Sequence, residues 1–365
     1  MVESGATPQV PGAVRRVLAA ARALTTPLMP DAYLELLNPM WSTRELRGTI
    51  TEIRHETHDT ATIVITPSRP WPGHDAGQYL RVGVEIDGIR HWRAFTLTSD
   101  PGHPRGVIAI TVKKVDGGLM STFLLEQAEP GAMLYLGESQ GEFGIDRRPE
   151  RPVLLISAGS GVTPMFALLR KLEREGWVDD VVHVFGVRTD EDVIFADRLR
   201  ALAAEHAGYT LHTWFSADKG RLTPADLADL VPDWRERTTY LSGPPSMIDT
   251  FKQHWSDEGL SDRFELERFQ PRAGADVEAG QGGTVRFRVS ETEVECDGST
   301  PILEAGEAAG LVLQHGCRMG ICHTCVGRLA EGRLRDMTTG NVYGAEGEMV
   351  RICVSSPEGH VEIEL

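Results

Sequence analysis

Four of the five cysteines lie near the C-terminal end of the chain, at spacings that few folds can accommodate. The segment HGCRMGICHTC has the pattern C-x4-C-x2-C, and 27 residues separate its last cysteine from the next. Five cysteines in 365 residues are too few for a disulfide framework, so this grouping favours a metal centre. The predicted ligands are Cys317, Cys322, Cys325 and Cys353.

The spacing is that of plant-type 2Fe-2S clusters. Thiolates are soft, anionic ligands that suit iron, and Gly316 and Gly320 would let the loop wrap closely, so that its N–H groups point at the sulfurs. Zinc is the alternative, although zinc ribbons usually pair two C-x2-C knuckles and this segment has one. Cys296 lies outside the spacing and is interpreted as a core or strand residue. His315 and His323 flank ligands but are not needed as ligands.

The length of the chain suggests two or three domains, and a succession of different patterns favours three. Residues 44–145 alternate polar and apolar residues between Gly, Pro and Asp turns, which predicts an antiparallel β-barrel. Residues 146–270 alternate apolar strands with helical stretches, which predicts a parallel sheet of the nucleotide-binding type. The predicted strands are 46–55, 61–66, 79–86, 91–98, 107–115 and 133–139 in the barrel, and 153–157, 181–187, 209–215 and 238–243 in the parallel sheet.

The two ends of the chain have patterns of their own. Residues 271–283 are rich in Gly and Ala and are predicted to be a flexible linker. Residues 284–365 then form a third domain, which begins with a hairpin and a short helix and contains the cysteine loop. Residues 1–43 are an N-terminal extension with a helix predicted over 11–26. We interpret that helix as packed on its own domain, with a partner or a membrane surface as the alternative contact.

Charge and hydropathy exclude some classes of function. The formal net charge of −16 argues against a nucleic-acid partner, because neutralising phosphates needs an excess of Lys and Arg. The sequence has no apolar run of the roughly 18 residues that would span a bilayer, and it begins without a signal-peptide pattern. We therefore expect a cytoplasmic protein that contacts membranes only indirectly, through a partner.

Residues 93–97, R-A-F-T-L, resemble the R-x-[FY]-[ST]-L flavin motif of the ferredoxin-NADP reductase family. The resemblance implies that Arg93 holds a flavin phosphate, that Phe95 stacks on the isoalloxazine, and that Thr96 reaches N5 as a catalytic hydroxyl. A guanidinium suits this role because its fork binds phosphate bidentately. Phe95 replaces the commoner Tyr, which preserves stacking and removes a hydroxyl contact.

A second phosphate contact is expected in the segment GGLMST, where glycines precede a predicted helix start. The residues are Gly117, Gly118, Ser121 and Thr122. In an arbitrary sequence this segment would be read as a turn and a helix cap. Because it follows the flavin motif in register, it favours FAD over FMN.

Two further segments resemble the nicotinamide site of the same family. AGSGVTPM follows an apolar strand and resembles the G-x-G-x-x-P loop, with Pro164 suited to the first helical position so that a pyrophosphate can lie at the helix N-terminus. YLSGPPSM resembles the C-G-P-x-x-M segment, with Ser242 in place of the usual Cys as a catalytic residue; a plain strand-to-helix turn is the alternative. The expected cofactor-binding residues here are Gly159, Gly161, Thr163, Pro164, Gly243 and Pro244.

The donor is expected to be NADPH, with NADH as the alternative. Arg188, Ser216 and Arg221 follow the second and third predicted strands, where relatives place contacts to a 2′-phosphate. Lys219 lies in the same segment. The acidic residues 190–192 favour NADH instead.

The resemblance covers residues 44–365 and implies a flavin β-barrel, a nicotinamide α/β domain and an α+β β-grasp ferredoxin domain. This is the order found in reductase components of oxygenases, hydroxylases and acyl-CoA desaturases, the last of an actinobacterial type. It implies an enzyme that carries electrons from NADPH through FAD and a 2Fe-2S cluster to such a partner. A redox sensor is the alternative from another class. Residues 284–365 hold 13 Asp and Glu against 7 Arg and no Lys, so an acidic docking face for a basic acceptor is expected.

Overall fold

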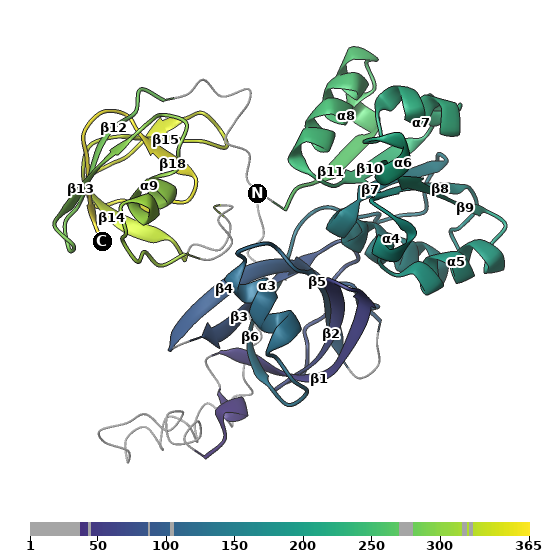
Figure 1. Ribbon diagram of the computed structural model, residues 1–365, viewed down its shortest axis with the longest axis horizontal. Helices are drawn as coiled ribbons and strands as arrows, with labels where there is room; N and C mark the ends of the chain where they lie inside the picture. Colours follow the sequence, from purple (N-terminus) through teal and green to yellow (C-terminus); the bar gives the residue numbers. More distant parts are fainter. Residues whose placement is uncertain are drawn as a thin grey trace.

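The computed structural model describes residues 37–42, 45–86, 88–102, 106–269, 280–315, 320 and 324–365, which form three lobes (Figure 1). Two predicted ligands, Cys317 and Cys322, lie outside the described residues, as do His323 and Gly316. The helix predicted over 11–26 and the larger part of the predicted linker also lie outside them. Within the described residues, no helix is both long and apolar enough to cross a membrane.

The first lobe is an antiparallel barrel, as the alternating pattern predicts. Its strand order is β4-β3-β6-β1-β2-β5, and a bridge between Leu97 and Ile110 joins the end of β4 to β5 and so closes the sheet. Ile63, Leu80 and Ile110 are fully buried inside it. The elements are η1 (Pro39–Trp41), β1 (Leu46–Thr57), β2 (Thr60–Pro67), β3 (Tyr79–Ile86), β4 (Ile89–Thr96), β5 (Ile108–Lys113), α3 (Leu119–Glu126) and β6 (Met133–Gln140).

The second lobe is a five-stranded parallel sheet of order β11-β10-β7-β8-β9. The chain leaves β7 for β8 and β9 on one side and returns to β10 and β11 on the other, so the order reverses between β7 and β10. Ligands of open α/β sheets bind outside the carboxyl ends of strands at such a reversal. The strands are β7 (Val153–Ala158), β8 (Val181–Val187), β9 (Tyr209–Phe215), β10 (Thr238–Ser242) and β11 (Phe264–Glu267).

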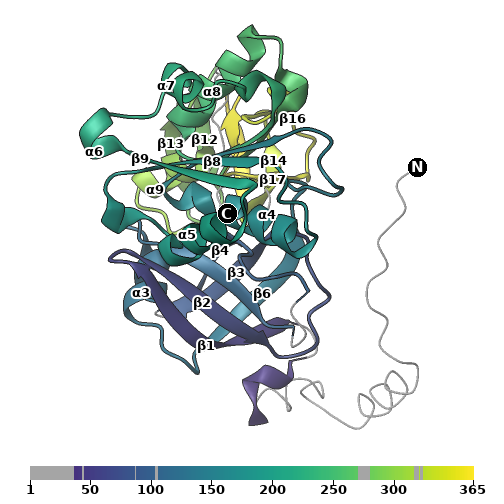
Figure 2. The same cartoon turned by 90° about the vertical axis from the view of Figure 1, so that its right-hand side faces the viewer.

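Helices cover both faces of this sheet, because β7 is apolar on both. Leu155 packs with Leu169 and Leu202 under α4 and α5, whereas Leu154 packs with Phe251 under α8 on the opposite face. Figure 2 shows α4 and α5 on the side of the sheet that faces the barrel. The remaining elements are η2 (Gly159–Gly161), α4 (Val162–Arg174), η3 (Asp190–Asp192), α5 (Ala196–Glu205), α6 (Ser216–Lys219), α7 (Pro224–Leu230), η4 (Trp234–Glu236), α8 (Pro245–Asp257) and η5 (Ser261–Arg263).

A buried polar chain crosses the middle of the parallel sheet. His183 is fully buried and is hydrogen-bonded to the Ser157 hydroxyl (2.8 Å) and the Tyr209 hydroxyl (3.0 Å). Burial lowers the pKa of His183 to about 3 and raises that of Tyr209. Both rings are therefore neutral at pH 7, and the chain of hydroxyls satisfies them inside the core.

The third lobe is a mixed sheet of order β13-β12-β19-β14-β17 with α9 packed on it, the β-grasp arrangement. The predicted hairpin is confirmed, since β12 and β13 pair antiparallel. Cys296 ends that hairpin and is buried in the core, as expected of a strand residue. The elements are β12 (Gly283–Phe287), β13 (Thr292–Cys296), α9 (Ile302–Ala308), β14 (Val326–Glu331), β15 (Leu334–Asp336), β16 (Val342–Tyr343), β17 (Met349–Arg351), β18 (Ser355–Pro357) and β19 (Val361–Glu364).

Helix α4 ties the second lobe to the barrel. Arg170 is partly buried, and its guanidinium donates to the Thr98 carbonyl oxygen (3.0 Å) directly beyond β4. One turn further along, Arg174 forms an ion pair with Asp100 (2.6 Å). Phe143, from the end of the barrel, packs in the core of the parallel-sheet lobe. These contacts fix the end of β4 against the start of the second lobe.

Candidate active site

The motif strand β4 ends at the wall of a cavity of about 850 Å³, which we call the central cavity. Arg93, Phe95 and Thr96 all line it. The Arg93 guanidinium donates to the Trp92 carbonyl oxygen (2.9 Å), and Thr96 is 6% exposed. The three residues that the sequence singles out therefore face one space, which is large enough for a flavin ring.

The loop before α3 forms a second wall of the central cavity. Gly118 and Ser121 line it, whereas Gly117 and Thr122 are not among the described residues that do. The Ser121 hydroxyl donates to the Gly118 carbonyl oxygen (3.1 Å) and accepts from the Val115 N–H (3.1 Å), so it holds the loop in shape. A Cβ at Gly118 would lie 2.7 Å from that hydroxyl oxygen, which explains the glycine.

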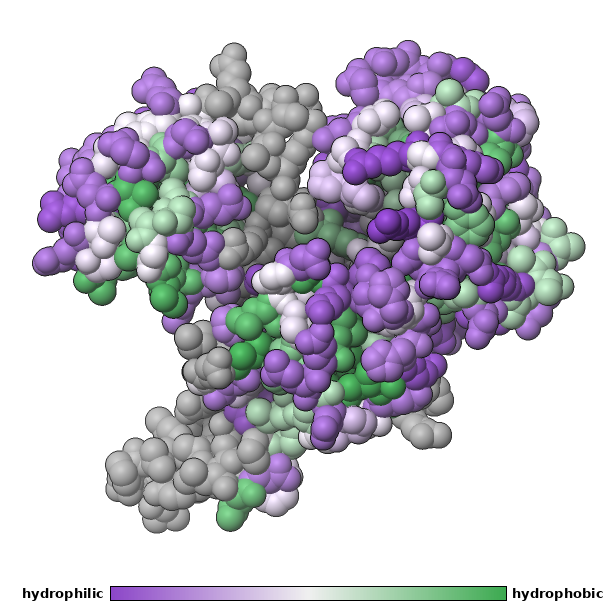
Figure 3. All heavy atoms as spheres, viewed as in Figure 1, coloured by the Kyte–Doolittle hydropathy of each residue, from purple (hydrophilic) through white to green (hydrophobic). Residues whose placement is uncertain are grey.

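Apolar side chains gather around this part of the barrel. Val115 and Leu119, on either side of the loop, are 61% and 51% exposed. Figure 3 shows hydrophobic atoms on the barrel face below the two upper lobes, which carry hydrophobic patches among their hydrophilic atoms as well. Two exposed apolar side chains therefore line the central cavity on its barrel side.

The third wall of the central cavity comes from the ferredoxin-like lobe. Cys353, Val354 and Met337 line it beside the flavin-motif residues. Cys353 and Cys325 are 3% and 2% exposed, and the Ile352 N–H donates to the Cys325 carbonyl oxygen (3.1 Å), which holds the two cysteine segments together. Two buried thiols on adjoining segments are a donor set that suits iron and is shielded from water.

A second cavity of about 860 Å³ lies at the carboxyl ends of the parallel strands, and we call it the strand-end cavity. Gly159 and Pro244 line it beyond β7 and β10, on either side of the reversal in strand order. Gly159 has a φ of +53°, in the left-handed region where glycine is favoured. Arg188, Ser216 and Arg221 line the far end, so all three predicted 2′-phosphate contacts face this cavity.

The glycine-rich loop separates the two cavities. Gly159 faces the strand-end cavity, whereas Thr163 and Ser160 line the central one. The Thr163 hydroxyl donates to the Ser160 carbonyl oxygen (3.0 Å). Pro164 is the third residue of α4, not the first as its motif predicts, because η2 occupies the preceding turn. It still lies in the first turn, where no N–H is needed for the helix.

Ser242 and Gly243 lie beneath that loop. A Cβ at Gly161 would be 2.2 Å from the Ser242 carbonyl oxygen, so only glycine lets the loop approach β10 this closely. A Cβ at Gly243 would be 3.3 Å from that of Ala158. The Ser242 hydroxyl is buried and has no hydrogen-bond partner among the described residues. It is not among the residues that line either cavity.

Charged residues of both signs line the strand-end cavity, with the cationic Lys113, Arg188 and Arg221 set against the acidic Asp59, Glu191 and Asp192. Asp190 is engaged by Arg200 (2.6 Å), and the Asp192 carboxylate accepts from the Thr189 N–H (2.9 Å) as a cap of η3. Two of the three acidic residues are thereby satisfied. Arg188, by contrast, has no side-chain partner among the described residues, and Lys219 lies over the Trp214 ring (4.9 Å).

Two cavity residues carry no local sequence signal. Lys113 lines both cavities and is paired with Asp59 (2.6 Å), which lies on the turn between β1 and β2. Phe269 lines the central cavity two residues beyond β11. That strand is only four residues long and lies at the sheet edge, so no pattern predicts it.

Glu267 is the last residue of β11 and lies opposite Ser242 on β10. Burial raises the pKa of Glu267 to about 7.

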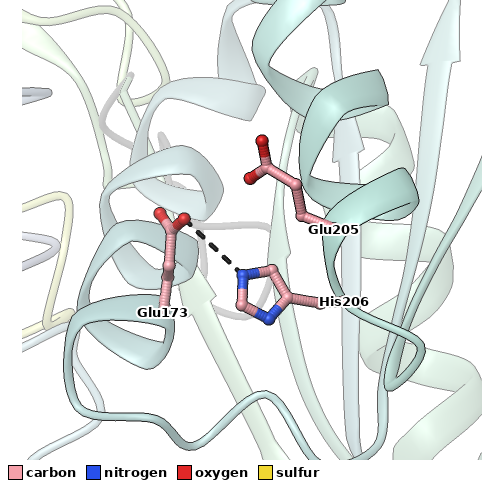
Figure 4. A group of neighbouring side chains, drawn as sticks. All are labelled: Glu173, Glu205 and His206. Atoms are coloured by element: carbon pink, nitrogen blue, oxygen red, sulfur yellow. Dashed lines mark ion pairs between the residues drawn. The ribbon is translucent and has the colours of Figure 1, made fainter.

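Among the described residues, one other group of side chains has donor atoms of the kind that metals bind. Glu173, Glu205 and His206 converge between α4 and α5 (Figure 4). Arg198 pairs with Glu173 and also with Glu205 (3.1 Å), and His206 lies 3.6 Å from Glu173. Because Arg198 already pairs with both carboxylates, we assign this group to helix packing.

Comparison with known protein families accounts for all three lobes. The model of the oxidoreductase FAD-binding domain matches residues 47–145, and that of the oxidoreductase NAD-binding domain matches residues 155–253. The model of the 2Fe-2S iron-sulfur cluster binding domain matches residues 286–358.

Individual relatives match nearly the whole chain. An NADPH oxidoreductase of Mycobacterium tuberculosis is 42% identical over 97% of this chain and 92% of that protein. NADH oxidoreductase HCR of Escherichia coli is 33% identical over 86% of this chain and 95% of that protein. The solved structure of phthalate dioxygenase reductase superposes with a TM-score of 0.61 at 23% identity, covering 88% of this chain and 98% of that one, and supports the fold.

The chain belongs to the ferredoxin-NADP reductase family of oxidoreductases, in the group that carries a C-terminal 2Fe-2S domain. It is an NAD(P)H-dependent flavin and iron-sulfur enzyme, and its cofactors are FAD and a 2Fe-2S cluster. The strand-end cavity suits the nicotinamide nucleotide, the central cavity suits the flavin, and the buried Cys325 and Cys353 suit the cluster.

Proposed function

We propose that this enzyme is a reductase component that takes reducing equivalents from NADPH and delivers single electrons to an oxygenase. The observation that carries the proposal is that Thr96 and Cys353 line one cavity, while Lys113 lines both that cavity and the strand-end cavity. Donor, flavin and cluster would then lie in the order in which electrons move. FAD supplies, when bound, the exchange between two-electron and one-electron transfer.

The chain's own residues would bind and orient the groups. Arg93 would bind a flavin phosphate with its guanidinium fork, Phe95 would stack on the ring, and Thr96 would hold its hydroxyl at N5. The loop at Gly118 offers N–H groups to a second phosphate at the start of α3. Ser242 is the proposed catalytic residue at the nicotinamide end, because it ends β10, the neighbour of β7, in the segment YLSGPPSM, although its hydroxyl lines neither cavity. Cys317 and Cys322 would complete the ligand set with Cys325 and Cys353.

The preference for NADPH rests on Arg188, Ser216 and Arg221 at the far end of the strand-end cavity. A relative named NADPH oxidoreductase favours it, and one named NADH oxidoreductase keeps NADH as the second candidate. Arg221→Gln should lower kcat/KM for NADPH about tenfold and leave that for NADH within twofold, because a charged hydrogen bond contributes about 1.5 kcal/mol. Arg235→Gln is the control, since Arg235 pairs with Glu258 outside the cavity.

An equal loss with both nucleotides would contradict the role of Arg221. Higher kcat/KM with NADH than with NADPH in the unaltered enzyme would overturn the preference itself.

The cofactor content and the order of reduction can be tested together. Purified enzyme should contain FAD, iron and sulfide, and on anaerobic mixing with NADPH the flavin absorbance should bleach before that of the cluster. The physical reason is that a hydride donor delivers two electrons and a 2Fe-2S cluster accepts one. Zinc in place of iron, or reduction of the cluster in flavin-free enzyme at the same rate, would overturn the proposal.

The proposed partner is an oxygenase, with a hydroxylase or an acyl-CoA desaturase as narrower possibilities. Relatives include the reductase subunit of a glycine betaine monooxygenase from Chromohalobacter salexigens (28% identical over 79% of this chain) and the reductase component of a naphthalene 1,2-dioxygenase system. The net charge of −6 over residues 284–365 suits a basic face on the acceptor. Electron transfer to it should slow as salt rises from 0.05 to about 0.5 M, and a salt-independent rate would contradict acidic docking.

We further propose the domain division 1–43, 44–145, 146–270, 271–283 and 284–365, in the order extension, flavin, nicotinamide, linker and ferredoxin domain. Cytoplasmic localisation, with any membrane contact made through the partner, is part of the same proposal. Limited proteolysis should cut first within 271–283, because that segment is rich in Gly and Ala. Faster cleavage inside 146–270 would contradict this division.

A further inference from the structure

A partly buried ion pair lies behind the cysteine segments of the ferredoxin domain. Arg351, at the end of β17, pairs with Asp336, at the end of β15 (Nη2 to Oδ2, 2.9 Å). The side chain of Asp336 is 9% exposed and that of Arg351 is 33% exposed. The other oxygen of Asp336 accepts from the Thr338 N–H (2.8 Å) and hydroxyl and from the Thr339 N–H (3.1 Å). The carboxylate is therefore rigidly held.

The second arm of the Arg351 guanidinium reaches the cysteine loop. Its Nη1 donates to the carbonyl oxygen of Gly320 (2.9 Å), which lies between the predicted ligands Cys317 and Cys322 in the sequence. Gly320 has a φ of +71°, and a Cβ there would lie 2.7 Å from a methyl carbon of Val354. Gly320 thus lies against Val354, the residue that follows Cys353, and its carbonyl oxygen is held by Arg351.

The same ion pair is connected to the central cavity. The N–H of Met337, next to Asp336, donates to the Val354 carbonyl oxygen (2.8 Å), and both Met337 and Val354 line that cavity. Arg351 itself lies two residues before Cys353. One cation and one anion are thereby fixed next to the segment that holds Cys353, and the cation contacts Gly320.

The geometry points to Arg351 as a positioning residue for the 2Fe-2S cluster, one that clamps the cysteine loop through Gly320 and sets the reduction potential together with Asp336. This inference rests on the proposed ligand set, of which Cys325 and Cys353 are described. The cluster becomes more negative when it accepts an electron, so a nearby cation favours the reduced form and a nearby anion disfavours it. Arg can make both contacts because its guanidinium is a planar fork, whereas Lys presents a single point charge.

The test uses full-length, cofactor-loaded enzyme with the changes Arg351→Met, Arg351→Lys and Asp336→Asn. Arg328→Met is the control, because this substitution removes the same charge. Arg328 lies on the neighbouring strand β14, is 58% exposed and pairs with Glu364 (3.4 Å). Iron and sulfide analysis first establishes that each variant carries a cluster, which separates failure of the ligand set from failure of this inference. The cluster's midpoint potential and the rate of cluster loss to a chelator are then measured.

Arg351→Met should lower the midpoint potential, and Asp336→Asn should raise it, each by a threefold to tenfold change in the reduction equilibrium; tenfold corresponds to about 59 mV for one electron. Arg351→Met should also lose its cluster about tenfold faster, because the Gly320 carbonyl loses a charged donor. Arg351→Lys should retain the potential and lose the cluster faster. Arg328→Met should change neither.

Shifts of the same sign in the two halves of the ion pair would overturn the inference, because a general loosening of the domain has no reason to follow the sign of the charge removed. Potentials equal to that of the control in both variants would overturn it as well, even if cluster loss accelerated.

Discussion

The two cavities have nearly the same volume, about 860 and about 850 Å³, but they are built in different ways. The strand-end cavity is lined almost wholly by segments that follow strands of one parallel sheet, with His58, Asp59 and Lys113 as the contribution of the barrel. The central cavity is lined by the end of β4, the loop before α3, the start of α4, and segments of the ferredoxin domain.

This difference determines which substitutions should affect each cavity. A site at the carboxyl ends of parallel strands is fixed by the topology of a single domain. A site shared by three domains exists only when they are docked, so changes in any of them reach it. We therefore expect substitutions in the ferredoxin domain to alter electron transfer across the central cavity and to leave nucleotide binding in the strand-end cavity unchanged.

The largest expected effect is that of removing a cluster ligand. Cys353→Ser, or Cys322→Ser, should lower cytochrome c reduction about 100-fold or more, because thiolate ligation is lost. Ferricyanide reduction at the flavin should fall less than threefold, and KM for NADPH should not change. Steady-state kinetics with the two acceptors measures this, with Cys296→Ser as the control because Cys296 is buried but lies outside the ligand set.

Equal loss of cytochrome c reduction and ferricyanide reduction in Cys353→Ser would contradict the distinction between the two cavities. It would mean that the flavin and nucleotide sites depend on the ferredoxin domain to the same degree as the cluster does.

The next largest effect is expected for Arg93, in the wall that the barrel supplies. Arg93→Ala should weaken flavin binding by about 1.5 to 3 kcal/mol, or roughly 10- to 150-fold, because a charged contact to phosphate is lost. Titration of flavin-free protein, followed by flavin fluorescence, measures the affinity. Arg90→Ala is the control on the same strand, since Arg90 pairs with Glu45 (2.6 Å). Similar affinities in the two variants would remove Arg93 from the flavin site.

A smaller, pH-dependent effect is expected at the edge of the parallel sheet, beside the central cavity. Burial raises the pKa of Glu267 from 4.5 to about 7, so the folded enzyme favours the protonated carboxyl. The contribution of the protonated Glu267 carboxyl to the free energy of unfolding is complete below about pH 4.5 and is lost as the pH rises through 7. At pH 8.5, the free energy of unfolding of Glu267→Gln should therefore exceed that of the unaltered enzyme by an amount on the order of 2 kcal/mol, and the variant should unfold at higher temperature. At pH 5 the difference should be small.

Glu265→Gln is the matched control for Glu267, because Glu265 lies on the same strand and is exposed. Calorimetric melting over pH 5 to 8.5 is the measurement. A difference between Glu267→Gln and the unaltered enzyme that does not change with pH would show that folding does not raise the pKa of Glu267.

The smallest expected effect concerns the tie between the nucleotide domain and the barrel. Asp100→Asn should weaken the ion pair with Arg174, a partly exposed pair that contributes at most about 1 kcal/mol. Flavin reduction by NADPH should slow less than fivefold, and cluster reduction by the flavin should keep its rate, because that step involves a different pair of domains. Stopped-flow absorbance resolves the two steps. A slower second step would show that the docking of the three domains is coupled.

Much of the fold follows from local pattern. The strand predicted over 79–86 has the bounds of β3, and the apolar runs of the parallel sheet correspond to β7 through β10. Alternation and buried apolar runs reflect which face of a strand meets a core, and that relation is local. β11 has too few residues to show a period, and Pro164 lies two residues further into its helix than its motif implies, because a turn of 3-10 helix intervenes.

The sequence by itself determined the chemistry of this protein: four thiols at cluster spacing, a flavin motif on a strand, and glycine loops after apolar strands. Those features are short segments whose meaning depends on residue type and spacing. Only the tertiary structure decided that Thr96 and Cys353 line one cavity, that Lys113 lines two, and that Arg351 reaches Gly320. Such contacts join residues far apart in the chain, and they exist because separately folded domains and strands pack against one another, which no local pattern encodes.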